Sequence, residues 1–302
     1  MPPTRTVTDA ADAFLARATA PTTRRSYGQT MSALTAAYGD RPLDALDGAA
    51  VAELAAHSWG TLAPATWNRH VATLASFTAF CRRTGWLQVD LCAGLERRPD
   101  RTDRTKAVAD TSLERLFRRK DVPVREKCLW RLLYETAARA QEVLSLNVTD
   151  VDLDNKRART VSKGGDTEWL HFQSGSARLL PRIIAGRPSG PLFLADRRPA
   201  PARAPAALDV CPVTGRGRLS YERAEYLFKR HSRRISRNGL TLHQLRHSAL
   251  TTLADANVSL PLLMAKSRHK NLRSLQRYVH PSAEAVAAMT AAHDPAARRR
   301  QY

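Results

Sequence analysis

Cysteine is scarce in this sequence, and no long hydrophobic run is present. Only four cysteines occur among the 302 residues, and none belongs to a C-x-x-C pair. This spacing argues against a disulfide framework and against a structural zinc site. The first residues have neither the apolar core nor the cleavage pattern of a signal peptide, and no stretch of about 18 apolar residues follows. We therefore expect a soluble, cytoplasmic protein with no membrane partner.

Acidic residues are few compared with basic ones. The sequence holds 28 Asp and Glu against 48 Lys and Arg, which gives a formal net charge of +20. Such a charge attracts polyanions and makes their binding depend steeply on salt. Only eight of the basic residues are lysine, so drift toward arginine in a GC-rich genome could explain part of the excess. The charge favours nucleic acid as a partner without assigning a function.

The length allows about two domains, each with a core of its own. Residues 8–97 read as helices throughout, and the clearest helix begins at Pro64 and stops at Gly85. Residues 98–108 are rich in charge and have no apolar periodicity, which predicts a linker. We therefore predict a helical domain over 1–97 and a second domain over 109–302.

The second domain should combine helices with a small antiparallel β-sheet. Thr111 and Glu114 form an expected capping box for its first helix, and two short strands should meet at a Gly-Gly turn as a hairpin. The segment 196–220, rich in Pro, Ala, Gly and Arg, predicts a long loop to which we assign no role. The remaining patterns indicate helices over about 124–137, 221–234, 242–256, 272–279 and 281–292, before a basic tail.

A set of polar residues near the C-terminus has a specific spacing. His243 and Arg246 stand three apart on a predicted helix, which places both on one face within reach of a single phosphate. His269 follows, and Tyr278 comes nine residues later on a short helix for which Asn271 is the expected N-cap. The H-x-x-R pair alone is a weak signal, but the whole segment is specific.

Two more basic residues lie upstream. Arg139 comes just past the end of a predicted helix, where its guanidinium can aim at an anion, and Glu142 follows one turn later. Lys163 stands at the tip of the predicted hairpin, where glycines allow a ligand to approach the backbone closely.

In order and spacing, these residues resemble the catalytic set of the tyrosine recombinase (phage integrase) family. The resemblance covers about 109–290, and the helical first half is similar to that family's SAM-like core-binding domain. It implies a site-specific DNA recombinase of a mobile element, bacterial or phage-encoded, acting in the cytoplasm at the nucleoid. The matching residues are Arg139, Lys163, His243, Arg246, His269 and Tyr278.

The resemblance also implies roles. Arg139 and Arg246 would grip the nonbridging oxygens of the phosphate during attack by Tyr278. The two histidines would donate hydrogen bonds, and His243 would help to take the tyrosine proton. Lys163 would protonate the leaving 5′-oxygen, and Glu142 would support Arg139. The product is a 3′-phosphotyrosine intermediate. No cofactor is needed, and the sequence has neither a G-x-x-x-x-G-K-[ST] loop nor clustered carboxylates for a metal.

By the same resemblance, the partners are two double-stranded DNA sites bound by a homotetramer that exchanges strands through a Holliday junction, with a possible accessory or excision factor. The helix over 281–292 could be donated to a neighbouring copy or pack within its own chain, about equally. Two alternatives stay open: a catalytically silent DNA-binding protein of the same fold, and a type IB topoisomerase.

Two positions depart from the usual family pattern. Ser267 and Arg268 replace a common Leu-Gly before His269, so either the local turn differs or Arg268 contacts DNA. Asn257 stands where a glycine often ends a helix, and asparagine tolerates that left-handed geometry.

Further arginines of the first domain are candidate DNA contacts, although a solvated helix face explains them equally well. His243 and His247 have the i, i+4 spacing of a zinc pair, but H-E-x-x-H is absent and no third ligand is apparent, so we expect no metal. The candidate DNA contacts are Arg24, Arg25, Arg69, Arg82 and Arg83.

Overall fold

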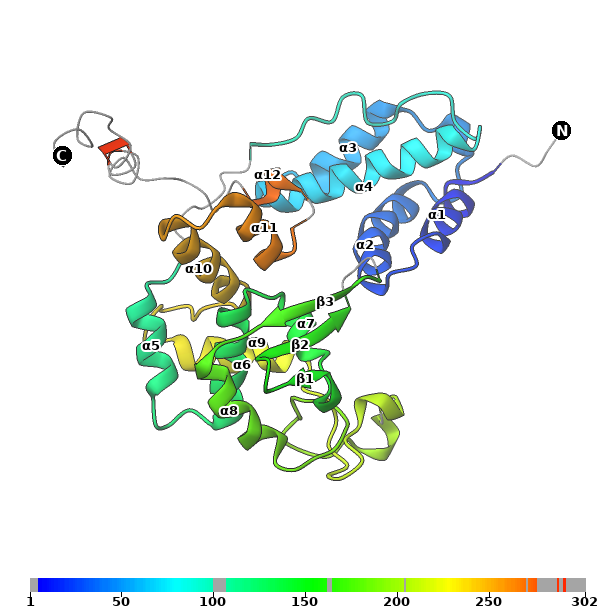
Figure 1. The fold of residues 1–302 in the computed structure, drawn as a ribbon. Helices are drawn as coiled ribbons and strands as arrows, with labels where there is room; N and C mark the ends of the chain where they lie inside the picture. Colours follow the sequence, from blue (N-terminus) through cyan, green and yellow to red (C-terminus); the bar gives the residue numbers. More distant parts are fainter. Residues whose placement is uncertain are drawn as a thin grey trace. The chain divides into compact units, whose positions relative to one another are not determined.

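The computed structural model describes residues 5–99, 107–161, 165–203, 205–269 and 271–275, and also residues 287, 290 and 291. The chain divides into two compact units, residues 1–102 and 103–302 (Figure 1). The expected linker over 98–108 includes this division, but residues 100–106 lie outside the described part. The linker and the exact domain bounds therefore stay predictions.

Unit 1 is helical. Thr6 and Asp9 start its first helix with a reciprocal capping box, and prolines occupy the first turn of two others, where a missing backbone N–H costs nothing. Phe14 anchors the core, because its ring lies 5.0 Å from that of Tyr27 and 5.6 Å from that of Phe77. The helices are α1 (Val7–Ala16), α2 (Pro21–Tyr38), α3 (Gly48–Trp59) and α4 (Pro64–Arg83).

The prediction that residues 8–97 are helical throughout is wrong at its end. Gly85 takes the left-handed conformation at φ 72°, and residues 84–99 contain no helix. Side chains of α4 form hydrogen bonds with backbone groups of this segment. The Trp67 indole N–H donates to the Glu96 carbonyl, and the Asn68 amide bonds both the N–H and the carbonyl of Arg98.

Unit 2 is built around the helix α6 (Val124–Thr136). Trp130 at its centre is fully buried, with the ring of Phe228 5.1 Å away. Packing against several elements leaves no residue of α6 exposed and makes it the scaffold on which the other elements are placed. Its neighbours are α5 (Asp110–Arg118), α8 (Ser174–Ile184), α9 (Tyr221–Ser232) and α10 (Leu242–Asp255).

The sheet of unit 2 has three antiparallel strands in the order β1-β2-β3. Ala158 of β2 pairs with Leu170 of β3, and both are fully buried, whereas the neighbouring side chains of each strand face outward. This alternation fixes the register. The strands are β1 (Val151–Asp152), β2 (Arg157–Val161) and β3 (Thr167–His171). The expected fold class, mainly α with a small antiparallel sheet, is confirmed.

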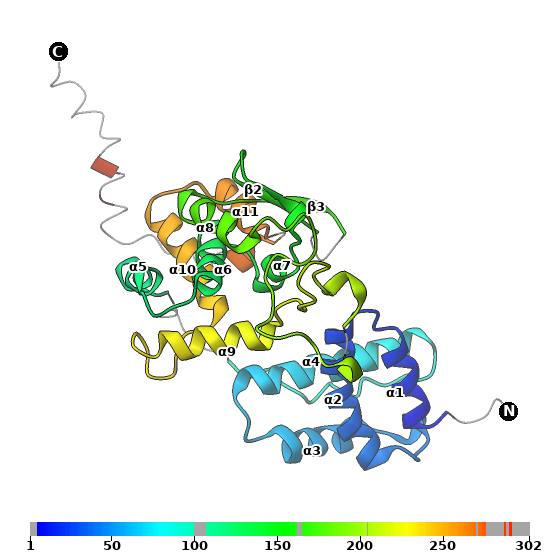
Figure 2. The same cartoon turned by 90° about the horizontal axis from the view of Figure 1, so that it is seen from below.

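Three short helices complete the description: α7 (Ala140–Leu144), α11 (Leu260–Ser267) and α12 (Leu272–Leu275). Figure 2 shows α7 between the sheet and α9. The sequence reasoning missed α11, although Ser259 as N-cap and Pro261 in the first turn are ordinary signals for a helix start. The helix expected over 281–292 lies almost wholly outside the described residues.

Two local predictions have opposite outcomes. The capping box of Thr111 and Glu114 is wrong, since α5 begins after Ala109 without a side-chain cap, and Asp110 instead accepts hydrogen bonds from Tyr134 and Thr252. Asn257 does take the left-handed conformation, at φ 58°. None of the described helices is both long enough and apolar enough to cross a membrane.

Where it is described, the loop over 196–220 contains two short 3-10 helices and an isolated bridge between Val210 and Gly217. Arg218 is one of the side chains that fix it to the rest of unit 2. Arg218 donates to the carbonyls of Leu144 and Leu146 at 3.0 and 2.9 Å, and to the Asn147 side chain at 2.8 Å. Its guanidinium also pairs with Asp209 of the same loop. Through Arg218, the loop is therefore hydrogen-bonded to residues 144–147, at and just after the C-terminal end of α7.

Candidate active site

Arg246 is the most buried charged residue among those predicted for the site. It lies on α10, which Thr241 and Gln244 start with a capping box, and only 1% of its surface is exposed. Its guanidinium donates to the carbonyl of Ala137 at 2.6 Å and to that of Ser267 at 2.7 Å. Ala137 can offer its carbonyl because it ends α6 in the left-handed conformation, at φ 50°. Arg246 thus joins the ends of α6 and α11.

His269 lies directly against this arginine. Its imidazole Nε2 is 3.3 Å from the Arg246 Nη2, and its Nδ1 is 2.7 Å from the Ser267 hydroxyl oxygen. Ser267 is fully buried and so provides a rigid partner on each side, through its carbonyl to Arg246 and through its hydroxyl to His269. Two members of the predicted catalytic set, Arg246 and His269, are therefore in contact.

Arg139 and Glu142 form a second hydrogen-bonded group in the site. Arg139 is the N-cap residue of α7, and its main-chain N–H and its guanidinium donate to the two oxygens of the Glu142 carboxylate, at 2.9 and 2.8 Å. The Arg139 side chain is 49% exposed, whereas that of Glu142 is 10% exposed. The carboxylate therefore holds the main chain and one nitrogen of the guanidinium, and about half of the side chain stays exposed.

Arg268 contributes a second cation to Glu142, at 2.8 Å. Burial raises the pKa of Glu142, but the charge of Arg268 and the hydrogen bonds from Arg139 and Arg268 outweigh it, so the pKa lies below its ordinary value. Burial, with the nearby charge of Arg268, lowers the pKa of Lys266, whose ammonium donates to the His171 carbonyl at 3.0 Å. The lowered pKa keeps the Glu142 carboxylate ionised between Arg139 and Arg268.

The sequence missed two features of this site. The carbonyl groups of Ala137 and Ser267 that position Arg246 carry no side-chain signature, so sequence reasoning had no signal for them. For Arg268, the sequence predicted either a local turn that differs from the family's or a contact with DNA. The structure instead shows it at φ 55°, a conformation that favours glycine, with its side chain 8% exposed and paired to Glu142. The two stated alternatives did not include this arrangement, and the DNA contact stays a prediction.

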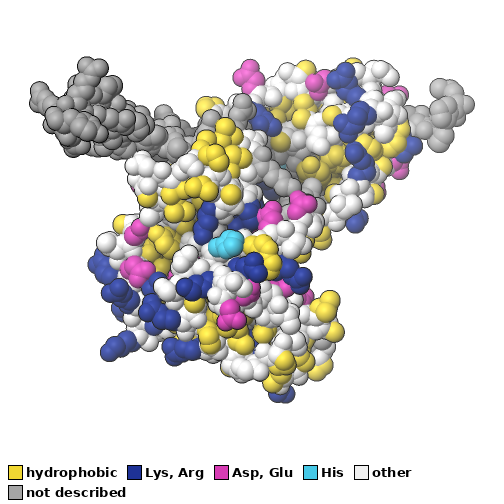
Figure 3. Space-filling view, viewed as in Figure 1, with side chains coloured by type: hydrophobic (Ala, Val, Ile, Leu, Met, Phe, Trp, Pro, Cys, Tyr) yellow, Lys and Arg dark blue, Asp and Glu magenta, His cyan; other side chains and the backbone are white. Residues whose placement is uncertain are grey.

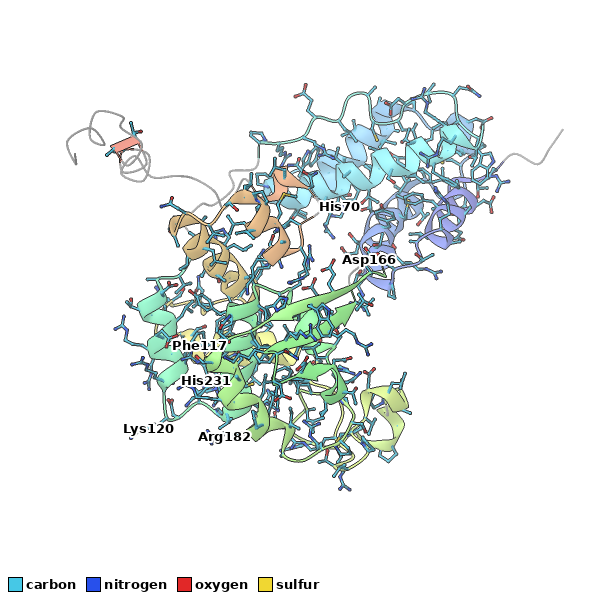
Figure 4. The ribbon with its side chains drawn as sticks, viewed as in Figure 1. His70, Phe117, Lys120, Asp166, Arg182 and His231 are labelled. Atoms are coloured by element: carbon cyan, nitrogen blue, oxygen red, sulfur yellow. The ribbon has the colours of Figure 1, made fainter. Side chains whose placement is uncertain are left out.

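Of the remaining candidate catalytic residues, only His243 lies within the described part of the chain. His243 lies exposed on the first turn of α10, one turn before the buried Arg246. Lys163 and Tyr278 lie outside the described residues. Asp166, labelled in Figure 4, lies just before β3 and follows Lys163 in the sequence by three residues. The described residues contain no group of three or more His, Cys, Asp or Glu side chains placed to hold a metal ion.

Unit 2 contains a pocket of about 740 Å³, and His269 and Arg268 are among the residues that line it. Its lining also includes Trp169 of β3, Leu253 of α10 and Leu262 of α11. On the face seen in Figure 3, Lys and Arg side chains gather over α5, so positive charge also lies outside the candidate site.

The candidate DNA contacts of unit 1 fall into two groups. Arg24 and Arg25 are exposed on α2, and Arg69 of α4 donates to the Gln29 side chain of α2 at 2.6 Å. Arg82 and Arg83 are exposed in the last turn of α4, about 20 Å along the helix from Arg69 at 1.5 Å per residue. Their contact with DNA stays a prediction.

Comparison with known proteins identifies the family. Residues 106–285 match the phage integrase family, and the chain belongs to it. The chain is 28% identical to the tyrosine recombinase XerC of Mycobacterium bovis (strain BCG / Pasteur 1173P2), over 91% of this chain and 92% of that protein. It is 25% identical to the XerC of Roseiflexus castenholzii, over 72% of this chain and 68% of that protein.

Solved structures share the fold. The Tn1549 transposon integrase in complex with a circular intermediate DNA has a TM-score of 0.72 at 15% identity, covering 96% of this chain and 99% of that chain. The lambda integrase tetramer bound to a Holliday junction has a TM-score of 0.69 at 14% identity, covering 92% and 78%. The expected family and fold are confirmed, and the protein is of the general kind of the DNA strand-exchange enzymes.

Proposed function

We propose that this chain is an active site-specific tyrosine recombinase whose nucleophile is Tyr278. The observation that carries the proposal is the contact of buried Arg246 with His269, together with the two hydrogen bonds by which Glu142 holds Arg139. Because Arg268, the chain neighbour of His269, binds the same carboxylate as Arg139, we infer that the two guanidiniums and the imidazole act on one phosphate, whose five-coordinate state needs such donors. Membership of the phage integrase family supports the same reading.

In the proposed reaction the Tyr278 oxygen attacks the phosphorus and the bond to the 5′-oxygen breaks. His243, exposed at the start of α10, helps to remove the tyrosine proton, because a phenol with a pKa near 10 is a poor nucleophile until it is deprotonated. Lys163 gives a proton to the leaving 5′-oxygen. The 3′-phosphotyrosine link conserves the bond energy, so a 5′-hydroxyl from a partner duplex can attack it and restore a phosphodiester.

The arginines have different parts in this scheme. Arg246 is bound through two backbone carbonyls, so its position is set before DNA arrives and costs no reorganisation in the transition state. Arg139 keeps half of its side chain exposed and would complete its contacts on the phosphate. His269, held by Ser267, would donate a further hydrogen bond to a nonbridging oxygen.

The test is covalent trapping on nicked suicide DNA, drawn from a labelled genomic library, in the presence of EDTA. The wild type should form an SDS-stable, protease-sensitive adduct, whereas Tyr278→Phe should bind the DNA equally well and form none. An adduct that survives Tyr278→Phe would refute the nucleophile. DNA binding by wild type without an adduct on any trapping substrate would instead favour a catalytically silent protein, and relaxation of supercoiled DNA at no particular site would favour a topoisomerase.

We further propose that four copies act on two DNA sites and exchange strands through a Holliday junction. The structural similarity to a lambda integrase tetramer on such a junction supports this assembly. Once a site is known, gel filtration of the Tyr278→Phe variant with a synthetic four-way junction should give a complex with four protomers. A complex that never exceeds two protomers would contradict it.

A further inference from the structure

Arg268 occupies a position where a long side chain is unfavourable for the backbone. It ends α11 in the left-handed conformation, at φ 55° and ψ 37°. Glycine adopts this conformation freely, whereas other L-residues pay about 1 kcal/mol or more for it. The turn itself gives no reason for an arginine, so the reason must lie in what the side chain contacts.

Those contacts join three elements of unit 2. The Nη2 of Arg268 donates to the Glu142 carboxylate of α7 at 2.8 Å, and Nη1 donates to the Lys266 carbonyl of α11 at 3.0 Å. Its Nε lies 3.4 Å from the Glu168 carboxylate of β3. The two Nη nitrogens thus donate hydrogen bonds to acceptors on α7 and α11, whereas Nε makes only an ion-pair contact with Glu168. The planar fork of a guanidinium fixes these directions, which the flexible ammonium of lysine does not.

The contact with Glu142 completes the set of hydrogen bonds around that carboxylate. One oxygen accepts from the Arg139 guanidinium, and the other accepts from the Arg139 main-chain N–H and from Arg268. Without Arg268, the second oxygen would keep only the main-chain donor and would lose its charged partner, so the carboxylate would be held less firmly. We therefore expect the orientation of Glu142, and through it that of Arg139, to depend on Arg268.

We propose that Arg268 is a positioning residue for phosphate binding by Arg139, acting through Glu142, and that its ion pair with Glu168 ties the β2–β3 hairpin to the same group. The proposal rests on the proposed function. A direct DNA contact is disfavoured, because the side chain is 8% exposed and its nitrogens face protein acceptors.

The first variant to make is Arg268→Gly, which removes the side chain and relieves the backbone, so the fold should persist. Single-turnover adduct formation at saturating DNA should fall on the order of 10- to 100-fold, the size expected for a misplaced catalytic group. DNA affinity should change less than about 2-fold. Arg268→Lys, which keeps the charge and loses the fork, should recover only part of the rate. Arg118→Gln, at a side chain that is 82% exposed, controls for the loss of one positive charge.

The decisive comparison is a double-mutant cycle with Glu142→Gln. If Arg268 acts through Glu142, then Arg268→Gly should cost little in the Glu142→Gln background, although it costs 10-fold or more in the wild type. Fully additive losses would overturn the proposal, and so would a wild-type rate in Arg268→Gly. Weakened DNA affinity with an unchanged rate at saturation would make Arg268 a DNA contact. Failure of the wild type to form any adduct would refute the proposed function itself, which separates the two questions.

Discussion

Replacement of Arg246 by alanine should destabilise unit 2 as well as abolish cleavage. The side chain is buried, and its guanidinium donates to the carbonyls of two fully buried residues, Ala137 and Ser267. A hydrogen bond from a charged group contributes about 1.5–3 kcal/mol, and alanine leaves both acceptors unsatisfied beside a cavity. We expect the free energy of unfolding to fall by about 3–5 kcal/mol.

Arg139 provides the matched comparison. Its side chain is 49% exposed, and Glu142 keeps Arg268 as a partner after Arg139 is removed. Arg139→Ala should therefore cost about 1 kcal/mol or less in stability, as other half-exposed ion pairs do. Both variants should lose cleavage, but only one should lose stability.

The assay is urea unfolding of the full chain followed by circular dichroism. Hydrogen exchange in peptides from α6 and α10 assigns the transition to unit 2. An Arg246→Ala variant that unfolds within about 1 kcal/mol of wild type would refute the reasoning, because it would show that the two carbonyls find other donors.

Three further predictions concern stability. The His70 imidazole is stacked on Trp59 and hydrogen-bonded to Thr30 and Arg69, and burial together with the Arg69 charge lowers its pKa. Unit 1 should therefore lose stability as pH falls through the unfolded-state pKa of 6.5, because the unfolded chain takes up the proton first. The variant His70→Gln should flatten that decline in thermal melts. Glu142 has a lowered pKa, so its stabilising effect is complete above the ordinary pKa of 4.5 and is lost as pH falls through the lower pKa of the folded state. Acid unfolding of Glu142→Gln should therefore be less steep below pH 4.5 than that of wild type. An identical slope would contradict this. Gly239 has φ 71°, and a Cβ there would meet the Lys229 carbonyl oxygen at 2.4 Å, so Gly239→Ala should cost about 2 kcal/mol or more in urea unfolding.

The sequence predicted the elements of the site better than their environments. The helix that carries His243 and Arg246 was foreseen, and so was the hairpin, because both follow from simple periodicity. It could not show that Arg246 would be buried while His243, one turn earlier, would be exposed. That difference depends on where the carbonyls of Ala137 and Ser267 lie, and backbone acceptors leave no trace in the sequence.

Arg268 shows the opposite limit. The departure from glycine was visible in the sequence, but its consequence was not, because the partner Glu142 lies 126 residues away. Only the fold brings the two together. The missed helix α11 is a different case, since its start signals at Ser259 and Pro261 were present and could have been used.

The attachment of the 196–220 loop by Arg218 matters for anyone who wishes to label this protein. Ala200 to Ala202 are exposed, and Leu208 and Val213 are largely exposed as well, whereas Arg218 is bonded to the chain that follows α7. A fluorophore or a short affinity tag placed at Ala200 would sit on the outer part of the loop. Keeping Arg218 intact would preserve the attachment, so single molecules could be followed on DNA without altering the residues that contact Arg139.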